Sequence, residues 1–402
     1  MKFYLSLLVA LLLTASEAYA TPRLALLSGT RCSACHVNPQ GSGLRTELGF
    51  SSMNEVGLWK WSEPASEEEA MLAEPATNVM ANGLIMPGVD VRVQQVRLST
   101  TGERLFIPMQ MSPYVAVMPT KELTVYGNYN IASAIYRMRE GKSTYPGQTD
   151  WEAAIQYQPG VTLPGIRVGM IQPSIGIRHD DHTVFARREI AMNGVNLIPP
   201  YYHDIGAEVT YEGMHWLTLN AGVFNAYNLS LADPLIGTID KQFDFAQPSF
   251  LGRVMLWPQL LDEGINGQVG ASLFTNGNMR MYNVFAGFGL ADKATFLIEG
   301  VYARRKFEEG ATLNDRIVRN FSVMGSYQIK SWLSAHWRYE WGQTELFEGQ
   351  GLSHANGFIV GAEFFPFPFI ELRPEYRYFE RNPFSEARTQ NGQYTVQLHV
   401  FY

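Results

Sequence analysis

The residues best suited to chemistry lie close together near the start of the chain. The only two cysteines among the 402 residues occur in the run Cys32-Ser33-Ala34-Cys35-His36. This spacing is the one used to attach c-type haem, because two thiols three residues apart can form thioethers to the haem vinyl groups and hold the next imidazole beside the iron. The motif predicts one covalent haem c, anchored by Cys32 and Cys35, with His36 as the proximal iron ligand.

Two other interpretations of the cysteine pair remain open. A thioredoxin-like redox pair has the same spacing but belongs in a βαβ context, which the surrounding residues do not show. A short disulfide is the other interpretation, since cysteines of exported proteins normally pair. Neither accounts for the histidine that follows, so the sequence favours covalent haem.

The second axial ligand of the iron is less well marked by the sequence. Soluble c-type cytochromes usually place a methionine well downstream of the haem histidine, and Met80 is the leading candidate for that role. Met86 and Met53 are further candidates, as are His336 and His399, which the strand pattern places on the inner face of a barrel. A cluster at 179–182, His-Asp-Asp-His, could bind a metal, but such residues in a solvated loop more often bind nothing.

The first 20 residues have the features of a signal peptide. Lys2 supplies a positive charge, residues 3–13 are apolar, and Ala18-Tyr19-Ala20 is a small-x-small cleavage site. An uncleaved anchor is the alternative, but the apolar stretch is too short to span a membrane. We expect residues 1–20 to be removed and the mature, exported chain to begin at Thr21.

Composition excludes two large classes of protein. The net charge is −7 and no basic cluster is present, which excludes nucleic acid as the main partner. After residue 20, no apolar run approaches the roughly 18 residues that a membrane-spanning helix needs. A content of 17% charged and 13% aromatic residues still suits an antiparallel barrel, whose strands carry no long apolar run.

From about residue 89 the apolar residues recur at every second position, as they do in amphipathic strands. Two segments near the C-terminus show this best, because apolar residues alternate there with a row of opposite charges. The polar rows are Ser334, His336, Arg338 and Glu340 in one segment, and Glu371, Arg373, Glu375 and Arg377 in the other. Such a row can neither face lipid nor fill a dry core, so it predicts the inner face of a barrel whose lumen is wide enough for water.

The same alternation divides the chain into about sixteen strands. They are expected near 89–99, 106–118, 122–137, 151–159, 166–176, 204–212, 215–225, 249–258, 265–275, 280–290, 294–306, 316–329, 332–343, 354–365, 369–380 and 392–402. Short links alternate with long ones, as they do in outer-membrane barrels. The sequence therefore predicts an all-β fold, a transmembrane antiparallel β-barrel at 85–402, with a small haem-binding cytochrome segment and linker at 21–84 as its plug. An even strand count leaves both termini in the periplasm.

These features together resemble the fused outer-membrane monohaem cytochrome–porins, a class that includes bacterial ferrous-iron oxidases. Outside the haem motif the resemblance is one of architecture, and near the motif it is carried by Pro22, Gly29, Cys32, Cys35, His36, Pro39 and Leu48-Gly49-Phe50. It implies electron transfer across the outer membrane of a Gram-negative bacterium through a haem held in or at the barrel. The implied partners are a periplasmic electron carrier, membrane lipid and an extracellular redox partner, with ferrous iron oxidised at the cell surface as one candidate.

Two other functions are consistent with the sequence. A passive porin with a structural or sensory haem would also have a wall of paired charges such as Arg373 and Glu371. Haem chemistry such as peroxide reduction would need a vacant iron position and an acid–base residue. No hydrolase triad, phosphate loop or zinc motif is present, so no catalytic residue is predicted.

Overall fold

The computed structural model describes most of the chain, including the cysteine motif and all the strands. The described residues are 22–41, 43–54, 57–58, 77–132, 151–160, 162–178, 184, 197–198, 202–225, 247–261, 264–277, 279–290, 293–309, 312–346, 351–384 and 387–402. The predicted signal peptide and the His-Asp-Asp-His cluster at 179–182 lie outside them. None of the described helices is long and apolar enough to cross a membrane.

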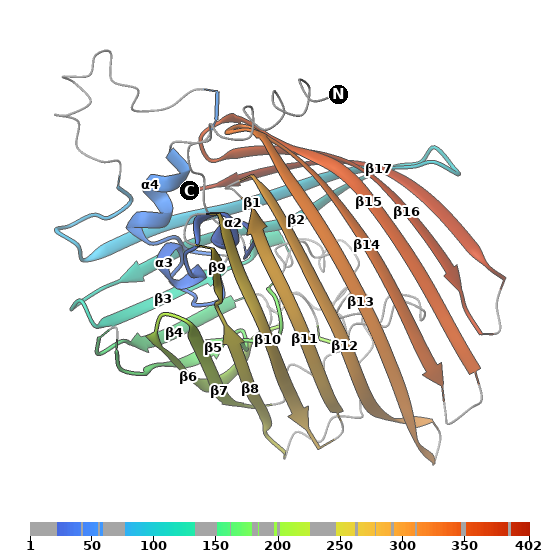
Figure 1. The fold of residues 1–402 in the computed structure, drawn as a ribbon, viewed down its shortest axis with the longest axis horizontal. Coiled ribbons are helices and arrows are strands. Elements are labelled where there is room, and N and C mark those ends of the chain that lie inside the picture. The colour runs from blue at the N-terminus through green and yellow to red at the C-terminus, as the bar shows by residue number, and fades with distance from the viewer. Residues whose placement is uncertain are drawn as a thin grey trace.

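Three short helices precede a single large sheet (Figure 1). The helices are α2 (Pro22–Ser28), α3 (Cys32–Cys35) and α4 (Glu47–Asn54). The strands are β1 (Ile85–Leu98), β2 (Arg104–Val117), β3 (Leu123–Tyr129), β4 (Trp151–Tyr157), β5 (Gly165–Ile171), β6 (Asp204–Met214), β7 (Leu217–Phe224), β8 (Ser249–Leu256), β9 (Gln259–Leu261), β10 (Ile265–Asn276), β11 (Met279–Leu290), β12 (Ala294–Glu309), β13 (Thr312–Lys330), β14 (Leu333–Leu346), β15 (Gly351–Phe367), β16 (Ile370–Asn382) and β17 (Thr389–Phe401).

The sheet closes on itself as a barrel. Every neighbouring pair is antiparallel, and β1 pairs with both β2 and β17. Strands β8 and β9 both pair with β10 and are separated by Trp257-Pro258. They share one position in the barrel, so the seventeen strands form a sixteen-stranded barrel. Proline has no backbone N–H to donate to a neighbouring strand, which explains why the pairing is interrupted between β8 and β9. The predicted all-β barrel of about sixteen strands is confirmed, and the break before β9 was not predicted.

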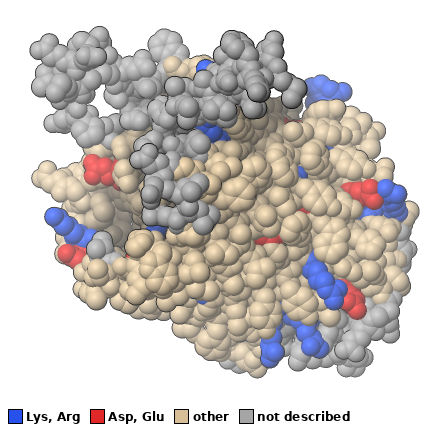
Figure 2. Space-filling model, in the orientation of Figure 1, with Lys and Arg blue, Asp and Glu red and all other residues tan. Residues whose placement is uncertain are grey.

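The two faces of the barrel differ as the alternation predicts. Along β16, Glu371, Glu375 and Arg377 are buried on the inner face. Apolar side chains such as Val284 and Phe250 are exposed on the outer face, and the view in Figure 2 shows an outer surface with few charges. An exposed apolar surface of this extent matches the lipid-facing band of a transmembrane barrel.

The two ends of the barrel differ in the length of their links. Short links join β2 to β3, β6 to β7, β11 to β12, β13 to β14 and β15 to β16 at one end, called here the turn end. The start of β1 and the C-terminal Tyr402 lie at this end, since Val89 and Tyr402 exchange backbone hydrogen bonds of 2.9 and 2.8 Å. Helices α2, α3 and α4 also lie there (Figure 1). The opposite end, called the loop end, carries the three longest links, at 130–150, 172–203 and 225–248, together with short ones such as those between β10 and β11 and between β12 and β13.

A segment that follows β5 turns into the lumen, where a continuation of the strand to residue 176 was predicted. Residues 172–178 cross the lumen and bind three separate strands. Ser174 N–H donates to Glu208 of β6 at 2.9 Å, Gly176 N–H to Ser272 of β10 at 2.9 Å, and Ile177 N–H to Glu299 of β12 at 3.2 Å. Gly176 has φ +52°, a conformation that L side chains adopt at a cost, so the backbone leaves the extended state there.

The interior is more apolar than the sequence led us to expect. One buried cluster runs from the N-terminal segment through the inward segment to the walls of β8–β13. Its members include Val37, Leu44, Met86, Ile171, Ile175, Leu251, Phe274, Met279, Met281, Val301 and Val318. This apolar cluster inside the barrel was not predicted from the sequence.

Candidate functional site

Helix α2 binds the inner wall of the barrel at the turn end. Leu26 is fully buried against Phe285 of β11 and Leu297 of β12. Asn266 of β10 donates from its amide to the carbonyl oxygen of Leu26 at 3.0 Å, which satisfies a carbonyl in a helix too short to do so alone. Arg23 forms an ion pair with Glu363 of β15, three strands further along the wall from β12. Helix α2 is thus held by apolar contacts, a hydrogen bond and a charge.

The cysteine motif forms the single turn of α3, directly after α2. Arg31, just before the turn, donates to the carbonyl oxygen of Glu212 at 2.6 Å and to that of Met214, at the end of β6. Ser33 donates from its hydroxyl to the Glu212 carboxylate at 2.7 Å. These bonds place the motif in the half of the lumen nearer the turn end.

The two thiols of α3 have different surroundings. Cys35 is buried and Cys32 is partly exposed, and the two are not joined by a disulfide. His36 follows with only 3% of its surface exposed, and its backbone N–H donates to the backbone carbonyl oxygen of Cys32 at 2.9 Å. Burial raises the pKa of the Cys35 thiol, and the nearby Arg45 guanidinium partly opposes that shift.

This difference predicts unequal reactivity in protein made without haem attachment. The thiolate is the reactive form, so the raised pKa of Cys35 leaves little of it at neutral pH. We expect a small alkylating reagent to modify Cys32 at pH 7 and to leave Cys35 largely unmodified, with modification of Cys35 increasing as the pH rises. Peptide mass spectrometry measures both sites. Equal rates in folded protein would contradict the prediction, and unfolded protein, in which both sites react, is the control.

Helix α4 covers the motif from the turn end. Gly49 lies so close to α3 that a Cβ there would overlap the carbonyl oxygen of Cys35, so no other residue fits without moving the helix. Phe50 stacks on Phe369 at 4.8 Å between ring centroids and meets Tyr402 edge-on at 4.9 Å. The helix is therefore fixed to the β15–β16 turn and to the end of the chain.

The donor set of α3 fits a c-type haem. Two thiols lie one helical turn apart and are not oxidised to a disulfide, and a buried imidazole follows them directly. Cys32 and Cys35 would hold the porphyrin through thioethers, and His36 would bind the iron. Tying these residues to Glu212 and Met214 gives the motif a fixed place against the wall.

The structure separates the candidates for the second ligand. Met80 pairs with Ile85 in an isolated bridge and has 54% of its surface exposed, so it would have to move inward to reach an iron beside His36. Met86 is 3% exposed and lies in the same apolar cluster as Val37, the residue after His36. Met53 is buried beside Phe50 instead. Met80 stays a prediction, and Met86 is the candidate that is buried in the same cluster as Val37.

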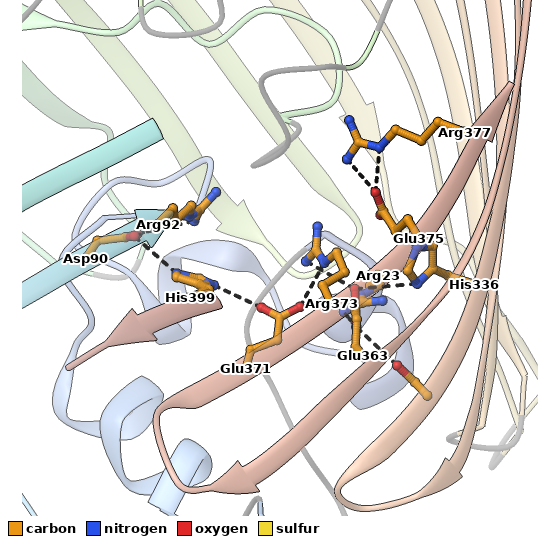
Figure 3. Close-up of polar contacts among 11 residues, drawn as sticks. Arg23, Asp90, Arg92, His336, Glu363, Glu371, Arg373, Glu375, Arg377 and His399 are labelled. Carbon is orange, nitrogen blue, oxygen red and sulfur yellow. Dashed lines mark hydrogen bonds and ion pairs between the residues drawn. The ribbon is translucent and has the colours of Figure 1, made fainter. Parts of the chain in front are cut away.

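The two lumen histidines are held by carboxylates (Figure 3). His399 lies 2.9 Å from Glu371 through Nδ1 and 3.1 Å from Asp90 through Nε2. Both ring nitrogens of His399 are therefore engaged by carboxylates. His336 uses Nε2 on Glu375 at 2.9 Å. Neither residue is therefore suitably placed as a haem ligand.

The charged rows of β14 and β16 form a wall of ion pairs along the lumen. Within one strand face, Arg373 pairs with Glu371 at 2.8 Å and Arg377 donates to Glu375 at 2.7 Å. On β14, Arg338 lies 3.4 Å from Glu340. Glu363 joins this wall to the N-terminal segment, because it pairs with Arg23 as well as with Arg373 (Figure 3). The prediction that these charges face the lumen and find partners there is confirmed.

One residue that the sequence did not single out links three parts of the lumen. Arg167 of β5 pairs with Glu208 of β6 at 2.9 Å, donates to the carbonyl oxygen of Gln172 in the inward segment at 2.9 Å, and reaches Asn38, just beyond the motif, at 3.2 Å. The one sequence signal for Arg167 is its charge between the apolar Ile166 and Val168, a pattern that places it on the inner face of a strand. The partners lie too far away in sequence to be predicted.

Comparisons with known proteins support the barrel. Residues 195–402 match the sequence profile of the family described as "Putative beta-barrel porin-2, OmpL-like". The outer membrane channel DcaP of Acinetobacter baumannii has a similar fold, with a TM-score of 0.56, 10% identity, and coverage of 79% of this chain and 97% of that one. An anion-selective porin from Comamonas acidovorans gives a TM-score of 0.50 at 8% identity, covering 79% and 99% of the two chains. A search of curated protein sequences gave no significant match.

These matches bear on the barrel and not on the cysteine motif. The family profile begins at residue 195, beyond α3, so the resemblance to cytochrome–porins is supported as regards the porin and has no support as regards the cytochrome or the iron oxidase. The two solved structures share the fold of this chain at low identity, and their names describe channels. A porin-like barrel is therefore shown.

Proposed function

Because this chain belongs to the β-barrel porin-2 family of OmpL-like proteins, we propose that it is a porin-type barrel of the Gram-negative outer membrane that carries a covalent haem c in its N-terminal segment. The observation that carries the proposal is the Cys32–His36 turn bound to the inner wall of the barrel. In barrels of this kind the short turns face the periplasm. The turn end, the motif and the C-terminus are therefore assigned to the periplasmic side, the compartment to which the predicted signal peptide would direct the chain.

A passive porin is the function that the family match favours. Its supporting observation in this chain is the wall of paired charges on β14 and β16, which is typical of a selective pore. The apolar cluster and the segment 172–178 lie inside the barrel, and we expect them to narrow the passage. In this function the haem is structural or sensory. Single-channel recording in a planar bilayer tests it, and a small conductance that persists after Cys32→Ser would support it.

Electron transfer is the second candidate, and the cysteine motif favours it. A bound haem supplies a one-electron couple between ferric and ferrous iron. The chain's own part is to hold the donors against Glu212 and to exclude water from Cys35 and His36, which are buried. With the turn end in the periplasm, a periplasmic carrier reaches this site directly. An external partner such as ferrous iron has to enter the lumen, because the apolar band to be crossed is about 25 Å tall.

An absorption spectrum of the purified protein separates the two candidates. The oxidised protein is mixed first with ferrous iron and then with dithionite as the reference for full reduction. Sharp c-type bands with ferrous iron support an iron-accepting conduit, whereas bands with dithionite alone leave another electron partner. The absence of haem bands in protein made with a cytochrome c maturation pathway would refute the haem and leave a porin.

The ion pair between Arg23 and Glu363 offers a test of closure by the N-terminal segment. In Arg23→Glu two carboxylates meet on the inner wall, where like charges repel strongly. We expect α2 to leave the wall and the mean conductance in a planar bilayer to rise several-fold. Arg104→Glu, an exposed change at the loop end of β2, is the matched control and leaves the conductance unchanged. Equal conductance of the Arg23 variant and wild type would show that α2 does not close the lumen.

A further inference from the structure

A small cavity of about 20 Å³ lies between α3 and the barrel wall. Cys32 lines it from the side of α3, and Arg253 and Met255 of β8 line it from the side of the wall. A larger cavity of about 650 Å³ adjoins the small one. The residues that belong to the walls of both cavities are Pro39, Glu212 and Trp257. The two cavities therefore mark the space beside Cys32 that a porphyrin attached there would enter.

Met255 offers an iron ligand on the far side of this space from α3. Among the described residues that line the small cavity, Met255 alone carries a thioether. Only 6% of its surface is exposed, and it packs with Ile177 of the inward segment. Methionine is the usual partner of histidine on the iron of c-type cytochromes. Its side chain is unbranched and flexible, so the sulfur can turn toward an iron without movement of β8.

The sulfur of Met255 is held by a neighbour on the same strand. Arg253 donates from Nη2 to Met255 Sδ at 3.3 Å. The guanidinium is itself fixed, because Nε donates to the carbonyl oxygen of Gly176 at 3.2 Å and Nη1 donates to Asn220 Oδ1 at 3.1 Å. Arg253 also lies close enough to Cys32 for the two groups to interact electrostatically. A thioether that accepts one hydrogen bond keeps a second lone pair, so this contact orients the sulfur as outer partners orient metal ligands.

The methionines that the sequence favoured are placed less well than Met255. Met80, Met86 and Met53 are not among the residues that line the small cavity. Met80 is exposed, and the other two lie in apolar clusters without either thiol. Met255 follows the motif at a far greater separation than a soluble cytochrome uses, and only the closure of the barrel brings β8 beside α3.

We propose that Met255 is the second axial ligand of a haem attached at Cys32 and Cys35, opposite His36, and that Arg253 positions its sulfur. This assignment rests on the proposed attachment of haem. It divides the iron site between two parts of the chain, since the N-terminal segment supplies the thioethers and the histidine and the barrel wall supplies the methionine. The cytochrome segment is then incomplete without the barrel.

The absorption spectrum of the full-length protein in detergent, made with a cytochrome c maturation pathway, tests the proposal. Methionine ligation gives ferric haem c a weak charge-transfer band at the red end of the visible spectrum, and we expect wild-type protein to show it. Met255→Leu should lose this band, change the haem from low-spin to high-spin and lower the midpoint potential, because a methionine ligand raises it. Met255→His should restore a low-spin spectrum without the band. Met281→Leu, which changes a buried methionine of β11 outside the cavity, is the matched control and should keep the band.

Haem staining on a denaturing gel separates this assignment from haem attachment itself. The thioethers do not depend on the second ligand, so Met255→Leu should stain as strongly as wild type. A band that persists in Met255→Leu, or that is lost in Met80→Leu or Met86→Leu, would overturn the assignment and leave the attachment intact.

Two further measurements keep the test decisive if Met255→Leu does not fold. Wild-type protein that carries haem but lacks the band has no methionine ligand, and this result would overturn the proposal. A band that is present in wild type and retained in both Met80→Leu and Met86→Leu would support Met255. Wild-type protein without haem would overturn the proposed attachment and this assignment together.

Discussion

Protein in which Cys32 and Cys35 are both replaced by serine should carry no covalent haem when it is produced with a c-type cytochrome maturation pathway, whereas we expect wild-type protein to stain for haem on a denaturing gel. Serine is nearly the same size as cysteine but forms no thioether, so the change removes the attachment chemistry with little effect on packing. The two residues lie on one turn beside the wall, and neither lies in a strand. The barrel should therefore still fold.

The controls for this prediction are a neighbouring substitution and a folding assay. Ser33→Ala removes the bond from the Ser33 hydroxyl to Glu212 but leaves both thiols, so it should retain haem. Heat-modifiable migration on gels reports whether the barrel is closed. Equal haem staining of the double variant and wild type would mean that the haem is not held by these thiols, and absent staining in wild type would mean that no haem is attached.

Glu208→Gln should lower the free energy of unfolding by about 3–5 kcal/mol, because it leaves the guanidinium of Arg167 buried without its counter-charge. Glu208 is fully buried, pairs with Arg167 at 2.9 Å and also accepts from the Ser174 hydroxyl at 2.6 Å. The variant therefore loosens the inward segment as well as the wall. Guanidinium-induced unfolding in detergent, followed by tryptophan fluorescence, measures the loss.

Two matched variants show whether the loss of stability comes from breaking the buried ion pair. Arg167→Met combined with Glu208→Leu removes both charges and should recover most of the stability, since apolar residues can replace a buried pair at little cost. Glu380→Gln breaks the exposed pair with Arg388, at the loop end, and should leave the unfolding midpoint unchanged. A midpoint for Glu208→Gln equal to that of wild type would show that Arg167 does not depend on this partner.

The strands could be predicted from the sequence because each inner face differs chemically from the outer one. In β16 the inner residues are charged and the outer ones apolar, so the alternation itself shows the face. In β11 the inner face holds Met279, Met281 and Phe285 with Asn283 among them, and the outer face holds Tyr282 and Val284, so the two faces are both mostly apolar. Such a strand is recognisable, but nothing in it shows that the lumen beside it is filled.

The contacts that shape the candidate site could not be predicted. Arg23 and Glu363 are separated by 340 positions, and Arg31 and Glu212 by 181. No local pattern connects residues so far apart, and each has a partner only because the barrel closes. The motif itself could be found, since its chemistry depends on five adjacent residues. The strand predicted at 122–137 was too long, because Asn130 accepts the N–H of Ala132 and ends the ladder with a turn.

The docking of α4 constrains the order in which the molecule folds. Its aromatic partners are Phe369, in the last hairpin, and Tyr402, the last residue, so the binding surface for Phe50 exists only when β17 has paired with β1. Contacts between the two ends of a chain close the largest possible loop and form late. The segment that is synthesised and exported first is therefore the last to reach its place. We therefore expect Cys32 and Cys35 to remain accessible until the barrel closes, which leaves time for the proposed attachment of haem.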